Sequence, residues 1–201
     1  MISTQITTTI GKSKDVYCFL ALLSTDTQRQ LASLLAELSA ELGDAAWVMP
    51  AEALHITLCE IVQFKDYSQD PQKIYEQHST EYIHRTADIM AKYDPITISF
   101  DLLHVSPQAI IIKGTDNGSF NQIRKEQVDL LPLPAETKMP PDIIHSSIAR
   151  FVKEVPLEDV ERIVKKHSIN IQETVSEFKL IHGLVSPLLK YEVIQSYPLV
   201  E

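Results

Sequence analysis

Two segments of the chain carry a histidine two residues before a hydroxyl side chain, in the same sequence context. Met49–Leu58 reads MPAEALHITL and Met139–Ile148 reads MPPDIIHSSI, so the two segments align without a gap. An imidazole has an ordinary pKa of about 6.5 and can therefore accept or donate a proton near neutral pH. A hydroxyl can donate a hydrogen bond to an anionic oxygen. The chain thus holds two matched sets of acid–base and anion-binding groups.

Each histidine lies in an apolar run that alternates as a β-strand does. Successive side chains of a strand point to opposite faces, so His55 and Thr57 share one face while the neighbouring leucines and isoleucine enter a core. The same alternation places His145 and Ser147 together. In a pseudo-symmetric fold, both histidine–hydroxyl pairs would face one cleft.

The tripeptide His-x-Ser/Thr is by itself weak evidence. Five of the seven histidines fit it, namely His55, His78, His84, His104 and His145. His78 and His84 lie in a segment with a helical pattern, where residues two apart point in different directions. His104 is the remaining candidate for a histidine–hydroxyl pair on a strand, but the proline that follows its motif indicates that the strand ends there. The repeated context therefore favours His55 and His145.

Two residues near the motifs, Arg150 and Cys59, carry side chains that could bind phosphate or a metal ion. Strict alternation places Arg150 on the buried side of its strand, so it is predicted to be structural or at the rim unless a bulge intervenes, although a guanidinium suits phosphate. The same parity places Cys59 on the face of His55, where these two and His145 could ligate zinc with an open fourth position. The spacing matches no established zinc pattern, and a small residue in the cleft wall is the other interpretation.

The surrounding pattern predicts strands and helices in a mixed order. Strands are expected over 16–22, 54–62, 96–100, 109–113, the second motif, 174–185 and 190–197, and helices over 25–42, 71–93, 119–131 and 156–166. We expect one domain over residues 1–201 with an α+β fold. Two pseudo-symmetric lobes of mainly antiparallel sheet would carry helices outside and a central cleft with both motifs.

The two motifs resemble those of the two-histidine (2H) phosphoesterase superfamily, which includes LigT-like cyclic phosphodiesterases and 2'-5' RNA ligase-like proteins. HITL from His55 and HSSI from His145 carry the resemblance, and the longer HSSIAR, ending at Arg150, is similar to the LigT-like form. The resemblance implies metal-independent and cofactor-independent hydrolysis of a 2',3'-cyclic phosphate or 2'-5' phosphodiester. His55 and His145 would be catalytic, and Thr57 and Ser147 would bind the phosphate.

The amino-acid composition limits the kinds of binding partner and the location that we expect for this protein. The formal net charge is −9 and no basic run exceeds Lys165-Lys166, which favours a small nucleotide or an RNA end over a long duplex. No apolar stretch approaches the roughly 18 to 20 residues that cross a bilayer, and the first residues have no secretory pattern. Cys18 and Cys59 are too few for a disulfide framework. A cytoplasmic monomer is the default expectation.

Two questions stay open at the level of sequence. Tyr17, Phe64, Phe151 and Tyr191 are available to stack a base, yet all could equally belong to the core. A binding protein of the same fold that does not turn its ligand over is the main alternative to an enzyme. A zinc hydrolase is a more distant one.

Overall fold

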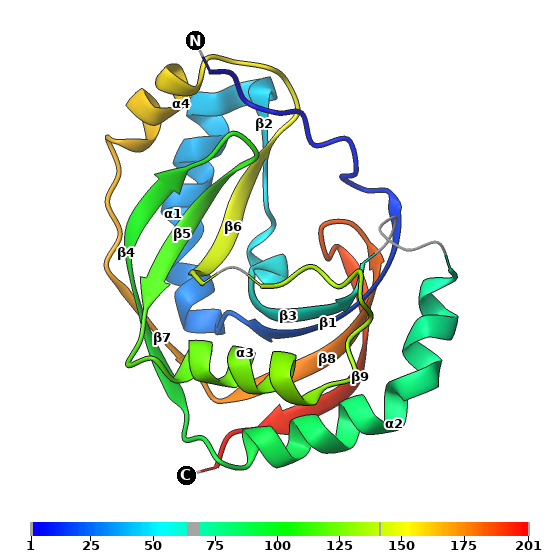
Figure 1. Ribbon diagram of the computed structural model, residues 1–201. Helices are drawn as coiled ribbons and strands as arrows, with labels where there is room; N and C mark the ends of the chain where they lie inside the picture. The colour runs from blue at the N-terminus through cyan, green and yellow to red at the C-terminus, as the bar shows by residue number, and fades with distance from the viewer. Residues whose placement is uncertain (1, 64–68, 141, 201) are drawn as a thin grey trace.

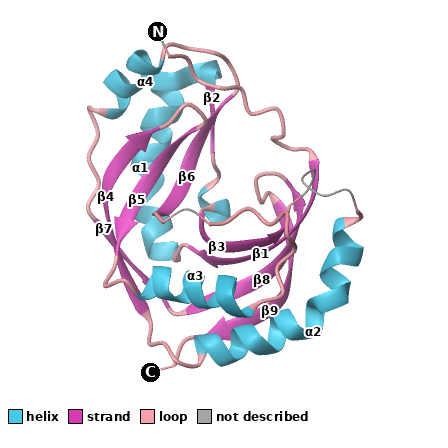
Figure 2. Cartoon of the chain, in the orientation of Figure 1, coloured by secondary structure: helices cyan, strands magenta, loops and turns pink. Residues whose placement is uncertain are grey.

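The computed structural model describes residues 2–63, 69–140 and 142–200, which form two antiparallel sheets with helices on their outer faces (Figures 1 and 2). The strands are β1 (Ser13–Leu22), β2 (Ala46–Val48), β3 (His55–Val62), β4 (Ile96–Val105), β5 (Ala109–Thr115), β6 (Ile144–Phe151), β7 (Ile171–Val175), β8 (Glu177–Val185) and β9 (Lys190–Pro198). The helices are α1 (Thr25–Leu42), α2 (Pro71–Met90), α3 (Ser119–Leu130) and α4 (Leu157–Val164), with short 3-10 turns at Gly43–Ala45 and Ala51–Ala53.

The strand order divides the molecule into two lobes. One sheet has the order β3-β1-β8-β9 and the other β2-β6-β5-β4-β7. In Figure 1, α1 and α4 lie beside the five-stranded sheet, whereas α2 and α3 lie against the four-stranded one. Each motif strand thus belongs to a different sheet. This arrangement confirms the predicted α+β fold of two antiparallel lobes with helices outside.

Helix ends follow the local sequence closely. Asp70 caps α2 by accepting a hydrogen bond from the Gln72 amide at 3.0 Å, and Pro71 occupies the first turn. The cap of α1 is Ser24, whose hydroxyl oxygen accepts from the Thr27 amide at 3.2 Å. None of the described helices is long and apolar enough to cross a membrane.

The expected single strand over 174–185 is wrong. The chain changes sheets at Ser176, so that β7 pairs with β4 in one lobe and β8 pairs with β1 in the other. Burial changes phase at this point, because Val175 and Phe178 are both buried although three positions separate them. No glycine or proline marks the break. Strand β2, which is only three residues long, was also missed.

The two lobes are joined next to the motifs. Strand β2 precedes the first motif along the chain but pairs with β6, which carries the second motif. The Met49 amide then donates to the Ile148 carbonyl at 2.9 Å. On the other side, the hydroxyl of Thr137, from the loop before the second motif, donates to the Ile61 carbonyl of β3 at 2.8 Å. Each motif strand is therefore held by the segment that leads into the other.

Candidate active site

Both predicted histidine–hydroxyl pairs open into one cleft of about 450 Å³. Strand β3 contributes His55, Thr57 and Glu60, and β6 contributes His145, Ser147 and Arg150. The remaining walls come from the end of β4, the β4–β5 turn, β5 and the loop before β6. Their lining residues are His104, Ser106, Gln108, Ala109, Ile111, Lys113, Lys138, Met139, Pro140 and Ile143. The structure thus brings together all four residues that the motifs single out.

A β-bulge interrupts each motif strand at the same place. Thr57 lies opposite Leu20 and Cys59 lies opposite Phe19, so Leu58 is an extra residue in β3. Ile148 is the extra residue of β6 in the same way. Because a bulge puts two residues against one, the alternation of faces is reversed beyond it.

The bulges overturn two predictions that were based on strict alternation. Arg150 lines the cleft instead of lying on the buried side. Cys59 does not line it; its side chain is fully buried in the main core, which separates it from His55 and His145. Within the described part of the chain, no three His, Cys, Asp or Glu side chains are close enough to hold a metal ion. The zinc arrangement is therefore not formed by these residues.

Glu60 is a cleft residue that the sequence reasoning missed. It occupies the position in the first motif that Arg150 occupies in the second, as the aligned runs HITLCE and HSSIAR show. In both motifs the fifth residue after the histidine is polar, and this shared position is the sequence signal that could have identified Glu60. The pseudo-symmetric cleft thus carries opposite charges at equivalent places.

One ring nitrogen of His55 is fixed by the backbone. Nδ1 lies 2.8 Å from the Ala53 carbonyl oxygen, and because a carbonyl can only accept, Nδ1 carries the proton. Burial lowers the pKa of His55 to about 4; the Ala53 contact opposes this shift, and the charges of Arg150 and Lys14 add to it. In the free protein His55 is therefore neutral, with a lone pair on Nε2.

His145 has a different environment. Burial lowers its pKa; the nearby Ile143 carbonyl opposes the shift, and Arg124, Arg150 and Lys113 reinforce it. The carbonyl lies close enough to favour the charged ring, but Nδ1 is buried without a partner in hydrogen-bond geometry among the described residues. The two histidines are thus equivalent in sequence and inequivalent in their surroundings.

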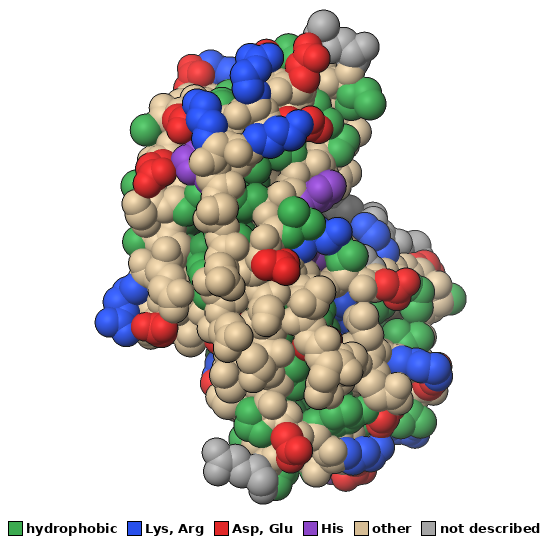
Figure 3. Space-filling view, turned by 90° about the vertical axis from the view of Figure 1, so that its left-hand side faces the viewer, with side chains coloured by type: hydrophobic (Ala, Val, Ile, Leu, Met, Phe, Trp, Pro, Cys, Tyr) green, Lys and Arg blue, Asp and Glu red, His purple; other side chains and the backbone are tan. Residues whose placement is uncertain are grey.

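The cleft is basic although the protein is acidic. Lys113, Lys138 and Arg150 line it, and Glu60 is the single carboxylate among its described lining residues. Burial lowers the pKa of Arg150, and the carboxylate of Glu60 opposes that shift. The buried Nε of Arg150 has no hydrogen-bond partner in the part of the chain that the structure describes. Acidic and basic side chains are interspersed over the face shown in Figure 3. The positive side chains that line the cleft suit it to bind an anion.

His104 and Ser106 also line the cleft, although the sequence context favoured only His55 and His145. The Ser106 hydroxyl is occupied by the β4–β5 turn, because its oxygen accepts from the amides of Gln108 at 3.3 Å and Ala109 at 3.1 Å. His104 is exposed. This pair therefore belongs to the rim and does not repeat the geometry of the two motifs.

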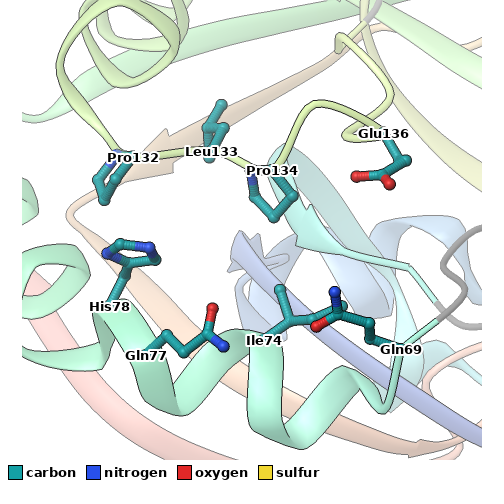
Figure 4. Close-up of a pocket in the computed structure, with 8 residues that line it drawn as sticks. All are labelled: Gln69, Ile74, Gln77, His78, Pro132, Leu133, Pro134 and Glu136. Atoms are coloured by element: carbon teal, nitrogen blue, oxygen red, sulfur yellow. The ribbon is translucent and has the colours of Figure 1, made fainter.

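The remaining histidine motifs and the aromatic candidates lie elsewhere. His78 faces a separate cavity of about 300 Å³ between α2 and residues 132–136, whose described walls contain no second histidine (Figure 4). Tyr17 and Phe151 are buried in the main core, and Tyr191 packs on a small second cluster. Phe64 lies outside the described residues.

No protein-family model and no curated protein matches the sequence. The fold of the chain, in contrast, matches several solved structures. TT0787 of Thermus thermophilus is 15% identical, with 92% of this chain and 97% of that chain covered at a TM-score of 0.66. LigT of E. coli in its apo form is 12% identical, with 94% and 100% covered at 0.57. The MHV ns2 PDE domain is 14% identical, with 85% and 99% covered at 0.54. The chain therefore has the LigT-like fold, as the resemblance of its two motifs predicted.

Proposed function

We propose that the protein is a phosphodiesterase that hydrolyses a 2',3'-cyclic phosphate or a 2'-5' phosphodiester of a nucleotide or an RNA end. The observation that carries this proposal is the single basic cleft into which both histidine–hydroxyl pairs open. Its volume of about 450 Å³ suits a small ligand. Two of the similar structures support this proposal, since one is named a phosphoesterase and another is E. coli LigT complexed with 3'-AMP.

The arrangement supplies an acid and a base on either side of a phosphorus atom. Neutral His55 takes a proton from water as the water oxygen attacks phosphorus. Protonated His145 donates its proton to the ribose oxygen as the P–O bond breaks. The bound phosphate anion raises the pKa of His145, because an opposite charge favours the protonated ring. Thr57, Ser147 and Arg150 stabilise the charge on the non-bridging oxygens.

A substrate screen tests this proposal. The protein is treated with a chelator and incubated with 2',3'-cyclic mononucleotides and with 2'-5' dinucleotides, beside a variant in which His55 and His145 are both alanine. We expect turnover by the wild type and none by the variant. Binding of a nucleotide without turnover would support the binding-protein alternative. Turnover that disappears with chelator and returns with zinc would support a zinc hydrolase.

The pH dependence follows from the pKa shifts of the two histidines. For the free protein, kcat/KM is expected to fall as the pH drops through about 4, where the base His55 becomes protonated. It should also fall as the pH rises and the acid His145 loses its proton, and this limb should lie below the usual 6.5 of histidine. Substrate phosphate raises the pKa of both rings, so the limbs of kcat should lie at higher pH than those of kcat/KM. Because the rings interact, each limb belongs to the pair. Coincident profiles for the two parameters would contradict this scheme.

The two hydroxyls are expected to contribute less than the histidines. A hydrogen bond to a charged group is worth about 1.5 to 3 kcal/mol, so Thr57→Ala or Ser147→Ala should lower kcat/KM by roughly one to two powers of ten. The matched control is Thr80→Ala, because Thr80 is exposed and follows His78 in the same tripeptide on α2. Initial rates at saturating and limiting substrate measure the effect. Equal rates in Ser147→Ala and Thr80→Ala would remove Ser147 from the site.

A further inference from the structure

Helix α3 inserts a buried arginine between the two motif strands. Arg124 is 4% exposed. On the β3 side, its Nη2 donates to the Thr57 carbonyl at 2.8 Å and its Nε donates to the Leu58 carbonyl at 3.1 Å. On the β6 side, its Nη1 donates to the Ile143 carbonyl at 2.9 Å. Nη1 also donates to Oδ1 of Asn121, one turn earlier on α3, at 3.0 Å. One side chain thus contacts the backbone of both motifs.

These carbonyls belong to the parts of the motifs that set the cleft geometry. Thr57 is a predicted phosphate-binding residue, and Leu58 is the bulged residue that redirects the rest of β3. Ile143 lies two positions before His145. Because β3 and β6 belong to different sheets, no sheet ladder connects them directly within the described residues. Arg124 provides a hydrogen-bonded link that the sheets lack.

The same side chain contributes to the difference between the two histidines. In the first motif, the Ala53 carbonyl, two residues before the histidine, orients His55. The corresponding carbonyl in the second motif is that of Ile143, and it accepts from Arg124 while Nδ1 of His145 has no partner among the described residues. Burial lowers the pKa of Arg124 to about 10, so it remains cationic at neutral pH. The guanidinium therefore acts on His145 through both charge and backbone.

A guanidinium is the side chain suited to this position. Burying a charge is costly unless its donors are hydrogen-bonded, and the planar fork of arginine satisfies several acceptors at once. A lysine ammonium is a point charge on a flexible stem and cannot span the same set of carbonyls. From these contacts we propose that Arg124 is a positioning residue, which holds the two histidine–hydroxyl pairs in register across the cleft. This inference rests on the proposed function.

Kinetics of three variants test the positioning. A displacement of about 1 Å can cost on the order of 10²-fold in rate, so Arg124→Met should lower kcat by roughly 10- to 100-fold, with a smaller change in KM. Arg124→Lys keeps the charge and should recover part of the loss. Lys125→Met is the control, because it removes the neighbouring exposed cation of the same helix. A folded Arg124→Met that retains the kcat of Lys125→Met would overturn the proposal.

A second variant covers the case in which Arg124→Met does not fold. Asn121→Ala removes one acceptor of the guanidinium, together with the hydrogen bond that Asn121 donates to the Asp142 carbonyl at 3.2 Å, and keeps the three carbonyl acceptors of Arg124. We expect a few-fold lower kcat, in the same direction as for Arg124→Met, with an unchanged circular dichroism spectrum. A kcat equal to that of Lys125→Met would count against the proposal.

A titration followed by NMR gives a readout that does not depend on turnover. Arg124 from α3, Arg150 from β6 and Lys113 from β5 are the charges that lower the pKa of His145, and Arg124 is not among the main charges acting on His55. Arg124→Met should therefore raise the pKa of His145 and leave the pKa of His55 unchanged. Arg124→Lys keeps the positive charge, so it should not raise the pKa of His145. Equal shifts in both rings, or none, would overturn the inference. A wild type without turnover refutes the proposed function alone, and the titration then decides the role of Arg124.

Discussion

Alanine at either His55 or His145 is expected to lower kcat by at least about 10²-fold, because positioned acid or base catalysis contributes roughly 10²- to 10⁴-fold. The double variant should be little slower than the more damaged single variant, since the base and the acid act in one step. Turnover of a 2',3'-cyclic nucleotide under saturating conditions measures the effect. The control is His84→Ala, because His84 fits the same tripeptide but is exposed on α2.

Two results would contradict the assignment of the histidines. One is a wild-type rate in either single variant. The other is a loss in His104→Ala as large as that in His55→Ala, because His104 lies on the exposed rim of the same cleft. Both motif histidines are buried enough to lower their pKa, so replacing either ring can also change the stability of the fold. Thermal unfolding of each variant measures that change separately from the change in rate.

Substitution of Arg150 by methionine should lower kcat/KM by roughly 10- to 150-fold, the equivalent of about 1.5 to 3 kcal/mol for a lost charge-assisted hydrogen bond to phosphate. Methionine keeps much of the length of the arginine stem, so the change removes mainly the charge and its donors. The same change at Arg162 is the control, because the Arg162 side chain is 72% exposed and pairs with Asp159 on the surface. Steady-state kinetics and inhibition by inorganic phosphate measure the effect.

The Arg150 result also decides between strict alternation and the bulged strand. A buried structural arginine would alter stability and leave phosphate inhibition unchanged. An arginine in the cleft would weaken phosphate inhibition, with a smaller effect on unfolding. Unchanged phosphate inhibition and unchanged kcat/KM in a folded Arg150→Met would therefore contradict the role given to this residue.

Local patterns in the chain were enough to place most elements and the motif histidines. The leucine stripe of α1 is buried as its spacing predicts, and Asp70 caps α2. The repeated frame around His55 and His145 identified the pair that shares the cleft. These features depend on residues that are near in sequence, where helical and strand periodicity and capping chemistry apply directly.

Tertiary structure decided the rest of the site. The bulges at Leu58 and Ile148 arise from pairing with β1 and β5, and they place Glu60 and Arg150 in the cleft while burying Cys59. The switch of sheets at Ser176 has no glycine or proline signal. In sequence, Arg124 is one more basic residue of an amphipathic helix. Its role appears only when β3 and β6 meet beneath α3, because contacts between segments distant in the chain depend on how the sheets pack.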